Sequence, residues 1–166
     1  MECATGPTQG NSVIFLDNVQ RIGKKAKRVI IASDHAGFEL KEYIKKFLLK
    51  KRKKVLDLGT KNSKSVDYPD YAHLLSRKMI NNKNVFGILV CGSGIGMDMT
   101  ANKHKNIRAA LCYDIKSAKL SRKHNNANVM AIGARLTKKN VALRCVSTFM
   151  KTNFEGGRHQ RRVNKI

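Results

Sequence analysis

Short apolar runs alternate with amphipathic stretches along most of this chain. Five short runs are predicted to be strands: residues 29–32, 55–58, 85–90, 109–112 and 129–132. The run at 85–90 is continuously apolar, which is typical of a strand buried on both faces of a parallel sheet. The stretches between and after them carry helical periodicity or helix-start signals: residues 38–51, the segment from 67, and residues 97–103, 114–123 and 140–152. Strands that alternate with helices favour right-handed βαβ units. The pattern therefore predicts an α/β fold of three layers, a doubly wound five-stranded parallel sheet with helices on both faces.

The helix expected at residues 38–51 shows how the charge is distributed. One stripe of this helix is apolar and consists of Leu40, Tyr43, Ile44, Phe47 and Leu48. Lysines fall outside the stripe, where an amphipathic surface helix places its charges: Lys41, Lys45, Lys46 and Lys50. The net charge of +23 permits binding to nucleic acid, acidic membranes or anionic metabolites, but this distribution favours solvated faces. Between residues 40 and 53, the aromatic residues belong to the apolar stripe and not to the lysine face, where a stacking platform for single-stranded nucleic acid would require them.

The length of 166 residues and a hydrophobic content of 42% suit one domain with a real core. Residues 1–27 are expected to be an extension without a fold of its own, and residues 28–166 a domain that ends in a basic helix or tail. No apolar run approaches the ~20 residues that span a bilayer, and the N-terminus does not resemble a signal peptide. Four cysteines lie far apart, without a C-x-x-C pair or zinc-type spacing to histidines: Cys3, Cys91, Cys112 and Cys145. We therefore expect reduced thiols in a cytoplasmic protein that binds neither metal nor membrane.

Chemically useful side chains follow four of the predicted strands. Open parallel sheets bind ligands outside the carboxyl ends of their strands, so these positions carry the functional expectation. They supply carboxylates, an imidazole, a thiol, a phenol and a guanidinium: Asp34 and His35, Cys91, Tyr113 and Asp114, and Arg135. One edge of the sheet is therefore expected to gather these groups.

Cys91 is the most informative of them, because the glycine-rich segment Gly92-Ser93-Gly94-Ile95-Gly96 follows it. The backbone N–H groups of such a loop can converge on an anion, or on negative charge that develops on oxygen during a reaction. Methionine at position 97 excludes both the dinucleotide fingerprint and a cysteine-phosphatase loop, and no Walker motif occurs. A thiol beside this loop indicates a general base next to an oxyanion site. The alternative is a buried structural cysteine, which we expect for Cys112 and Cys145.

An ordered set of motifs extends this interpretation: Ile31-Ala-Ser-Asp34-His35-Ala-Gly37-Phe-Glu-Leu-Lys41, Asp67-Tyr68-Pro69, Cys91-Gly-Ser-Gly-Ile-Gly96, Ala101-Asn102-Lys103, Leu120-Ser-Arg-Lys-His124-Asn125-Asn126 and Gly157-Arg158-His-Gln-Arg161-Arg162. From about residue 28 to the C-terminus, the set resembles the type B ribose-5-phosphate isomerases. The resemblance implies a Rossmann-like fold and an aldose–ketose isomerase that interconverts ribose 5-phosphate and ribulose 5-phosphate through an enediolate, in the non-oxidative pentose phosphate pathway. It also implies a homodimer with shared active sites, with pairing into tetramers left open, and no metal or organic cofactor.

By position, the resemblance implies a role for each motif. Cys91 would move the proton between C1 and C2 of the sugar. The anion hole for the enediolate would come from the glycine loop: Gly92, Ser93, Gly94, Ile95 and Gly96. His124 would open the furanose ring, helped by Asn125, while Asp34 would hold sugar hydroxyls and Tyr68 would line the pocket. Cationic side chains would hold the phosphate: His35, Arg135, Arg158 and Arg162.

Several of these residues also have simpler interpretations. His124 fits an exposed position at a helix end, Asp34 a helix N-cap, and His35 a turn. Arg158 and Arg162 are four positions apart, so on a helix they share a face and can grip one phosphate together. Two other functions stay open as alternatives: a basic nucleic-acid-binding protein on the same fold, which the complete set of motifs disfavours, and an isomerase of a six-carbon sugar phosphate.

Overall fold

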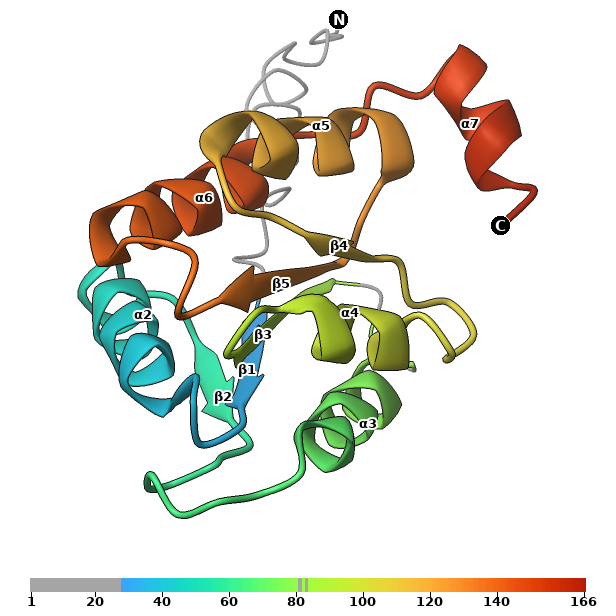
Figure 1. The fold of residues 1–166 in the computed structure, drawn as a ribbon. Coiled ribbons are helices and arrows are strands. Elements are labelled where there is room, and N and C mark those ends of the chain that lie inside the picture. Colours follow the sequence, from blue (N-terminus) through green and yellow to red (C-terminus); the bar gives the residue numbers. More distant parts are fainter. Residues whose placement is uncertain (1–27, 81, 83) are drawn as a thin grey trace, which may run out of the picture.

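The computed structural model describes residues 28–80, 82 and 84–166, which form a five-stranded parallel sheet with helices on both faces (Figure 1). The strands are β1 (Arg28–Ser33), β2 (Val55–Asp57), β3 (Val85–Cys91), β4 (Ala109–Leu111) and β5 (Val129–Gly133). Their order is β2-β1-β3-β5-β4, so the chain winds outward in both directions from the β1–β3 pair. The predicted doubly wound, Rossmann-like fold is confirmed. The predicted extension at residues 1–27, with Cys3, lies outside the described residues.

Two separate cores join the helices to the sheet. One face is covered by α2 (Phe38–Lys50), α5 (Ile115–Asn125) and α6 (Lys139–Lys151), the other by α3 (Tyr68–Met79) and α4 (Ile95–Ala101), while α7 (Arg158–Val163) lies beside α5. On the first face, Ile44 and Phe149 are completely buried. On the second, Leu75 and Met97 are completely buried. Within the described part of the chain, no helix has both the length and the apolar character that a membrane crossing requires.

Local signals in the sequence account for most element boundaries. β3 is buried along its whole length because it pairs with β1 on one side and β5 on the other, which explains its continuous apolar run. As expected, α3 begins directly after Asp67, with a proline in its first turn. α4 begins at Ile95, two residues before the predicted start, because Gly94 adopts a left-handed backbone (φ 82°) and turns the chain into the helix.

Two predictions for α2 are wrong, because Lys41 does not lie on the solvent-exposed face and Tyr43 is not buried with the apolar stripe. Lys41 is 0% exposed, and its ammonium donates to both carboxylate oxygens of Asp57 at 2.8 Å. Asp57 ends β2 beneath the helix, so a charged side chain is buried here because it is paired. Tyr43, in contrast, is exposed.

Candidate active site

A cavity of about 570 Å³ opens at the carboxyl ends of β1 and β3. Sheets of this topology bind ligands at this position. Many predicted site residues line it: Asp34, His35, Tyr68, Cys91, Gly92, Ser93, Ile95, Gly96 and Arg135. Met99 and Leu136 line it too, although no motif in the sequence indicates a role for them. The structure therefore brings the expected thiol, glycine loop, carboxylate, imidazole and guanidinium together around one space.

Cys91 ends β3 and lies in the wall of this cavity, with 4% of its surface exposed. Its Sγ accepts a hydrogen bond from the backbone N–H of Gly94 at 3.1 Å, and the left-handed backbone of Gly94 makes this turn possible. Cys112 and Cys145 are fully buried outside the cavity wall, and burial raises the pKa of their thiols to about 12 and about 11. The geometry fits a general base at Cys91 and structural roles for the other two.

Asp34 and His35 come from the turn between β1 and α2, which lies directly against β3. The Asp34 N–H donates to the carbonyl oxygen of Val90 at 3.2 Å, and a Cβ at Gly37 would lie 2.2 Å from the same oxygen. Glycine therefore lets the turn approach the strand that carries Cys91. The Asp34 carboxylate accepts the N–H of Gly37 at 2.8 Å, but Gly37 itself is the N-cap of α2. The interpretation of Asp34 as the N-cap is wrong, although its carboxylate closes the turn before the helix.

Arg135 and Tyr68 pack over two glycines of the loop. A Cβ at Gly92 would lie 3.1 Å from Nη1 of Arg135, and a Cβ at Gly96 would lie 2.6 Å from the Tyr68 ring. The Arg135 N–H donates to the carbonyl oxygen of Gly92 at 3.0 Å, which joins the end of β5 to the loop. Nδ1 of His35 lies 3.2 Å from the backbone of the segment that precedes α3. An imidazole and a guanidinium on one cavity wall suit a phosphate group.

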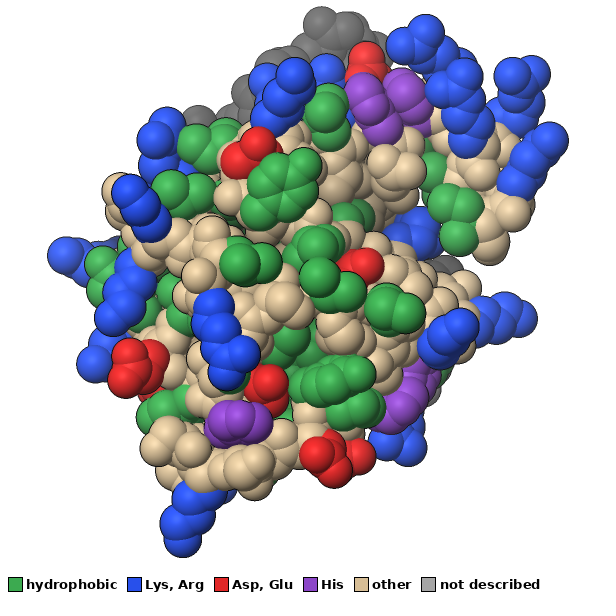
Figure 2. Space-filling model, in the orientation of Figure 1, with side chains coloured by type: hydrophobic (Ala, Val, Ile, Leu, Met, Phe, Trp, Pro, Cys, Tyr) green, Lys and Arg blue, Asp and Glu red, His purple; other side chains and the backbone are tan. Residues whose placement is uncertain are grey.

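Exposed apolar side chains surround the mouth of this cavity. Met99 and Leu136 are 63% and 69% exposed, and Ile95 is also exposed. Tyr113 is also exposed and follows the carboxyl end of β4, at the same edge of the sheet. Figure 2 shows hydrophobic side chains gathered on this face, over β4 and α4. Contiguous exposed apolar patches are typical of surfaces at which proteins bind other molecules.

The remaining predicted residues do not line this cavity: Gly94, Tyr113, Asp114, His124, Asn125, Arg158 and Arg162. Gly94 stays next to it, because its N–H donates to Sγ of Cys91. α5 starts after the carboxyl end of β4 and runs back to the start of β5, so its last turn, with His124, lies where the strands begin. Arg158 and Arg162 lie on α7, which contacts α5. One chain thus places the expected base and anion hole in one region, and the expected ring-opening residue and two arginines in another.

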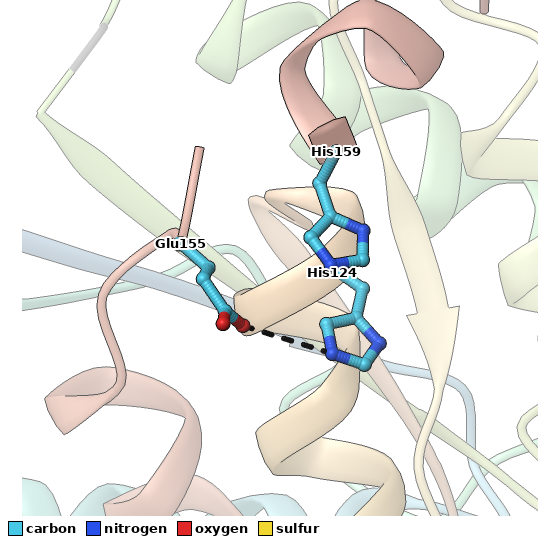
Figure 3. Close-up of side chains that lie close together, drawn as sticks. All are labelled: His124, Glu155 and His159. Carbon is cyan, nitrogen blue, oxygen red and sulfur yellow. Dashed lines mark ion pairs between the residues drawn. The ribbon is translucent and has the colours of Figure 1, made fainter. Parts of the chain in front are cut away.

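His124 is part of a small cluster between α5 and α7 (Figure 3). Its ring stacks on that of His159, with centroids 4.2 Å apart and planes at 7°, and its Nε2 lies 3.8 Å from Oε2 of Glu155. Desolvation and the nearby charge of His124 lower the pKa of His159, while a hydrogen bond from Lys123 lowers the pKa of Glu155. The simpler interpretation holds in part, because His124 lies in the last turn of α5 with a partly exposed side chain, but the residue also contacts His159 and Glu155. Sequence reasoning missed Glu155 and His159, although His159 stands inside one of the motifs.

Comparison with known proteins gives consistent matches. The family described as Ribose/Galactose Isomerase matches residues 29–166. The probable ribose-5-phosphate isomerase B of Mycoplasma pneumoniae is 47% identical over 139 residues, 83% of this chain and 91% of that protein. A crystal structure of a ribose 5-phosphate isomerase from Thermotoga maritima is 49% identical with a TM-score of 0.81, and the match covers 83% of this chain and 95% of that one. The ribose-5-phosphate isomerase B of Mycoplasma genitalium, solved with bound ribulose-5-phosphate, is 44% identical with a TM-score of 0.80, over 83% and 92% of the two chains.

Proposed function

Because the chain belongs to the ribose/galactose isomerase family, and is therefore a sugar-phosphate isomerase, we propose that it interconverts ribose 5-phosphate and ribulose 5-phosphate. The names of the relatives support a pentose phosphate as substrate, as does the ribulose-5-phosphate bound to the Mycoplasma genitalium protein. In this chain, the observation that carries the proposal is the Cys91 thiol on the cavity wall beside the glycine loop. We assign the reaction to the non-oxidative pentose phosphate pathway in the cytoplasm, a reducing compartment that suits the free cysteines of the described residues.

The reaction needs a base for a carbon-bound proton and donors for the charge that its removal leaves on oxygen. The Cys91 thiolate takes the proton from C2 of the open-chain aldose, and the thiol returns it to C1 of the enediolate while the hydroxyl proton of O2 passes to O1. N–H groups of the Gly92–Gly96 loop and the Ser93 hydroxyl stabilise the enediolate oxygen. A positioned base contributes typically ~10²–10⁴ in rate, and one oxyanion donor about 10²–10³. The Gly94 N–H, which already points at Sγ, also stabilises negative charge on the sulfur.

Other residues of the cavity bind the remaining groups of the substrate. Asp34 binds sugar hydroxyls, since its carboxylate is held at the cavity by the N–H of Gly37. Tyr68 forms one wall. His35 and Arg135 bind the phosphate dianion, for which a planar guanidinium and an imidazole are suitable donors.

The active unit in this proposal is a homodimer with shared sites. His124, which opens the furanose ring with help from Asn125, lies outside the cavity of its own chain. The exposed apolar side chains at the cavity mouth favour cover by another protein surface. A second copy that packs on this face brings its own α5 and α7 to the cavity, and with them Arg158 and Arg162 as further phosphate ligands. Each site then combines Cys91 of one chain with His124 of the other.

Cys91→Ala tests the proposal directly. Purified wild-type protein, treated with a chelator, should interconvert the two pentose phosphates, and Cys91→Ala should lower kcat by at least about 10²-fold because the base is gone. Cys145→Ala is the matched control, since it removes a buried thiol outside the cavity wall and should keep kcat. Wild-type protein that folds and dimerises without turning over either pentose phosphate would contradict the proposal. A six-carbon sugar phosphate assayed beside ribose 5-phosphate decides between the two substrate classes.

A further inference from the structure

We propose that His124, Glu155 and His159 form a binding site for a divalent transition-metal ion such as Zn²⁺, and that occupation of this site inhibits the isomerase. One ligand atom from each of the three side chains lies within 4.8 Å of the other two. Two imidazoles and one carboxylate are a ligand set that Zn²⁺ uses in proteins, with a fourth position left for water (Figure 3). The inhibitory part rests on the proposed role of His124, whereas the binding part does not.

Contacts within the chain already hold the three ligands near one another. His124 lies in the last turn of α5, and His159 is the second residue of α7 and is 7% exposed. Glu155 belongs to the segment between α6 and α7, and its N–H donates to the carbonyl oxygen of Lys123 at 3.0 Å. This bond fixes the segment against the end of α5. Only side chains therefore need to move when an ion binds, and little backbone entropy is lost.

Zinc binding requires the three side chains to move closer together and the two imidazole rings to leave their stacked arrangement. Zinc bonds of about 2.0–2.2 Å in a tetrahedron separate the ligand atoms by roughly 3.3–3.6 Å. Because all three ligand atoms already lie within 4.8 Å of one another, no separation has to shorten by more than roughly 1.5 Å. An imidazole binds a metal through the lone pair in its ring plane, and two rings only 7° from parallel cannot both aim at one point. The His124 and His159 rings must therefore tilt out of their stack. His124 and Glu155 are both partly exposed, which leaves room for this change.

Neighbouring positive charges determine which ions can occupy the site. Lys123 Nζ lies 3.3 Å from Oε2 of Glu155 and competes with a metal for that carboxylate. Arg158 directly precedes His159 on α7, and Arg162 follows His159 by three positions on the same helix. Mg²⁺ and Ca²⁺ bind oxygen ligands mainly through charge, so the positive side chains of Lys123, Arg158 and Arg162 disfavour their binding. Zn²⁺, Co²⁺ and Ni²⁺ bond strongly to imidazole nitrogen and are the ions that fit.

An ion at this site takes the lone pair of His124 that ring opening requires, and it holds the ring in a tilted position. It also ties α7, with Arg158 and Arg162, to the end of α5. The isomerase reaction needs no metal in the proposed mechanism, so the ion acts as an inhibitor of the step that His124 performs.

The binding part is tested by calorimetric titration of chelator-treated Cys91→Ala protein with ZnCl₂, because this background lacks the cavity thiol. We expect one ion per chain, and binding at least about tenfold weaker in Glu155→Gln and in His159→Gln. Glu39→Gln, a change of charge on the exposed side of α2, is the matched control and should bind as before. Lys123→Met should bind more tightly, because the competing ion pair is gone. Co²⁺ bound to nitrogen and oxygen should show no thiolate charge-transfer band, and MgCl₂ should give no binding.

Unchanged zinc affinity in both Glu155→Gln and His159→Gln would overturn the site. The inhibitory part is tested with wild-type protein and Glu155→Gln, each compared with its own rate in chelator. Zn²⁺ should inhibit the wild type reversibly, and the inhibiting concentration should rise in Glu155→Gln by the same factor as the dissociation constant. Equal inhibition of both proteins would assign the effect to Cys91 and contradict the regulatory role. Zinc binding by a protein without isomerase activity would contradict the proposed function and leave the site standing.

Discussion

Two cysteines, one at the end of β3 and one just after β4, show how single contacts decide the chemistry of a thiol. The Sγ of Cys112 donates to the carbonyl oxygen of Ala110 at 3.4 Å, and burial raises the pKa of this thiol to about 12. The Sγ of Cys91 instead accepts an N–H at 3.1 Å and lies in a cavity wall. A sulfur that accepts a hydrogen bond is stabilised when it carries negative charge, whereas a sulfur that donates one keeps its proton. The backbone N–H of Gly94 is therefore the contact that matters most for the proposed base.

Gly94→Ala tests this contact. Alanine at φ 82° costs about 1–2 kcal/mol, and its Cβ would lie 2.5 Å from the Leu111 side chain and 2.9 Å from the Gly133 nitrogen, so the loop must shift. We expect kcat to fall by at least about tenfold because the N–H leaves Sγ, with a smaller change in KM. Steady-state kinetics and urea denaturation measure the two effects.

Gly156→Ala is the matched control for stability. Gly156 is also left-handed (φ 68°), but a Cβ there would meet nothing within 4 Å. Gly156→Ala should therefore lower the free energy of unfolding only by the cost of a left-handed backbone at alanine, and Gly94→Ala should lower it further because its Cβ also clashes. Equal losses in the two variants, together with an unchanged kcat in Gly94→Ala, would contradict the importance of this loop geometry.

The parts of the site that are adjacent in sequence could be predicted, and the parts that depend on packing could not. Cys91 and its glycines form one continuous segment after an apolar run, so their position at a strand end followed from the pattern. Met99 and Leu136 belong to none of the motifs, and only the cavity shows that they line it. Glu155 lies 31 residues beyond His124, and nothing in that spacing indicates that their side chains meet.

Among the secondary-structure elements, α2 shows most clearly how far hydrophobic periodicity can predict which side chains are buried. Its apolar residues Leu40, Ile44 and Leu48 are buried as predicted. Lys41 is buried as well because Asp57, 16 residues away on β2, lies beneath it. That partner comes into contact only when the helix packs on the sheet, so no pattern within the helix could indicate it.

Asp57→Asn should destabilise the protein more than Lys41→Met does. The first change leaves a buried ammonium without its main partner, with an expected loss of roughly 1–3 kcal/mol in the free energy of unfolding at neutral pH. The second replaces the ammonium by an apolar group of similar length and leaves Asp57 paired with Lys45 at 2.6 Å. Urea denaturation of the two variants measures the difference. A larger loss in Lys41→Met would show that burial of the charge itself stabilises the fold.

The pH dependence of this difference gives a second measurement on the same variants. Burial alone would raise the pKa of Asp57, but hydrogen bonds from Lys41 and Lys45 outweigh it and hold the pKa below its usual value. A carboxylate with a lowered pKa contributes its full stability above the unfolded pKa of about 3.9 and loses it as the pH falls through the folded value. The stability gap between wild type and Asp57→Asn should therefore shrink in acid. A constant gap would contradict the ion pair as its cause.

At the scale of the whole molecule, the predicted site residues fall into two groups. Cys91, the glycine loop and Asp34 meet at the carboxyl ends of the strands, while His124 lies where the strands begin. The order of the motifs along the chain could indicate which residues belong to one reaction. It could not indicate how many chains build one site, because a linear pattern contains no information about contacts between copies. The separation within one chain is the structural argument for a site between two copies.

Mixing two inactive variants tests that argument. Cys91→Ala and His124→Asn should each be nearly inactive alone, since every site of either dimer lacks one group. After joint unfolding and refolding in equal amounts, half of the dimers pair the two variants, and one of their two sites then holds an intact Cys91 and an intact His124. Activity should return to about a quarter of the wild-type value. Variants that are refolded separately and mixed without subunit exchange are the control. If Cys91 and His124 of the same chain acted together, no pairing would restore an intact site, and the mixture would stay inactive.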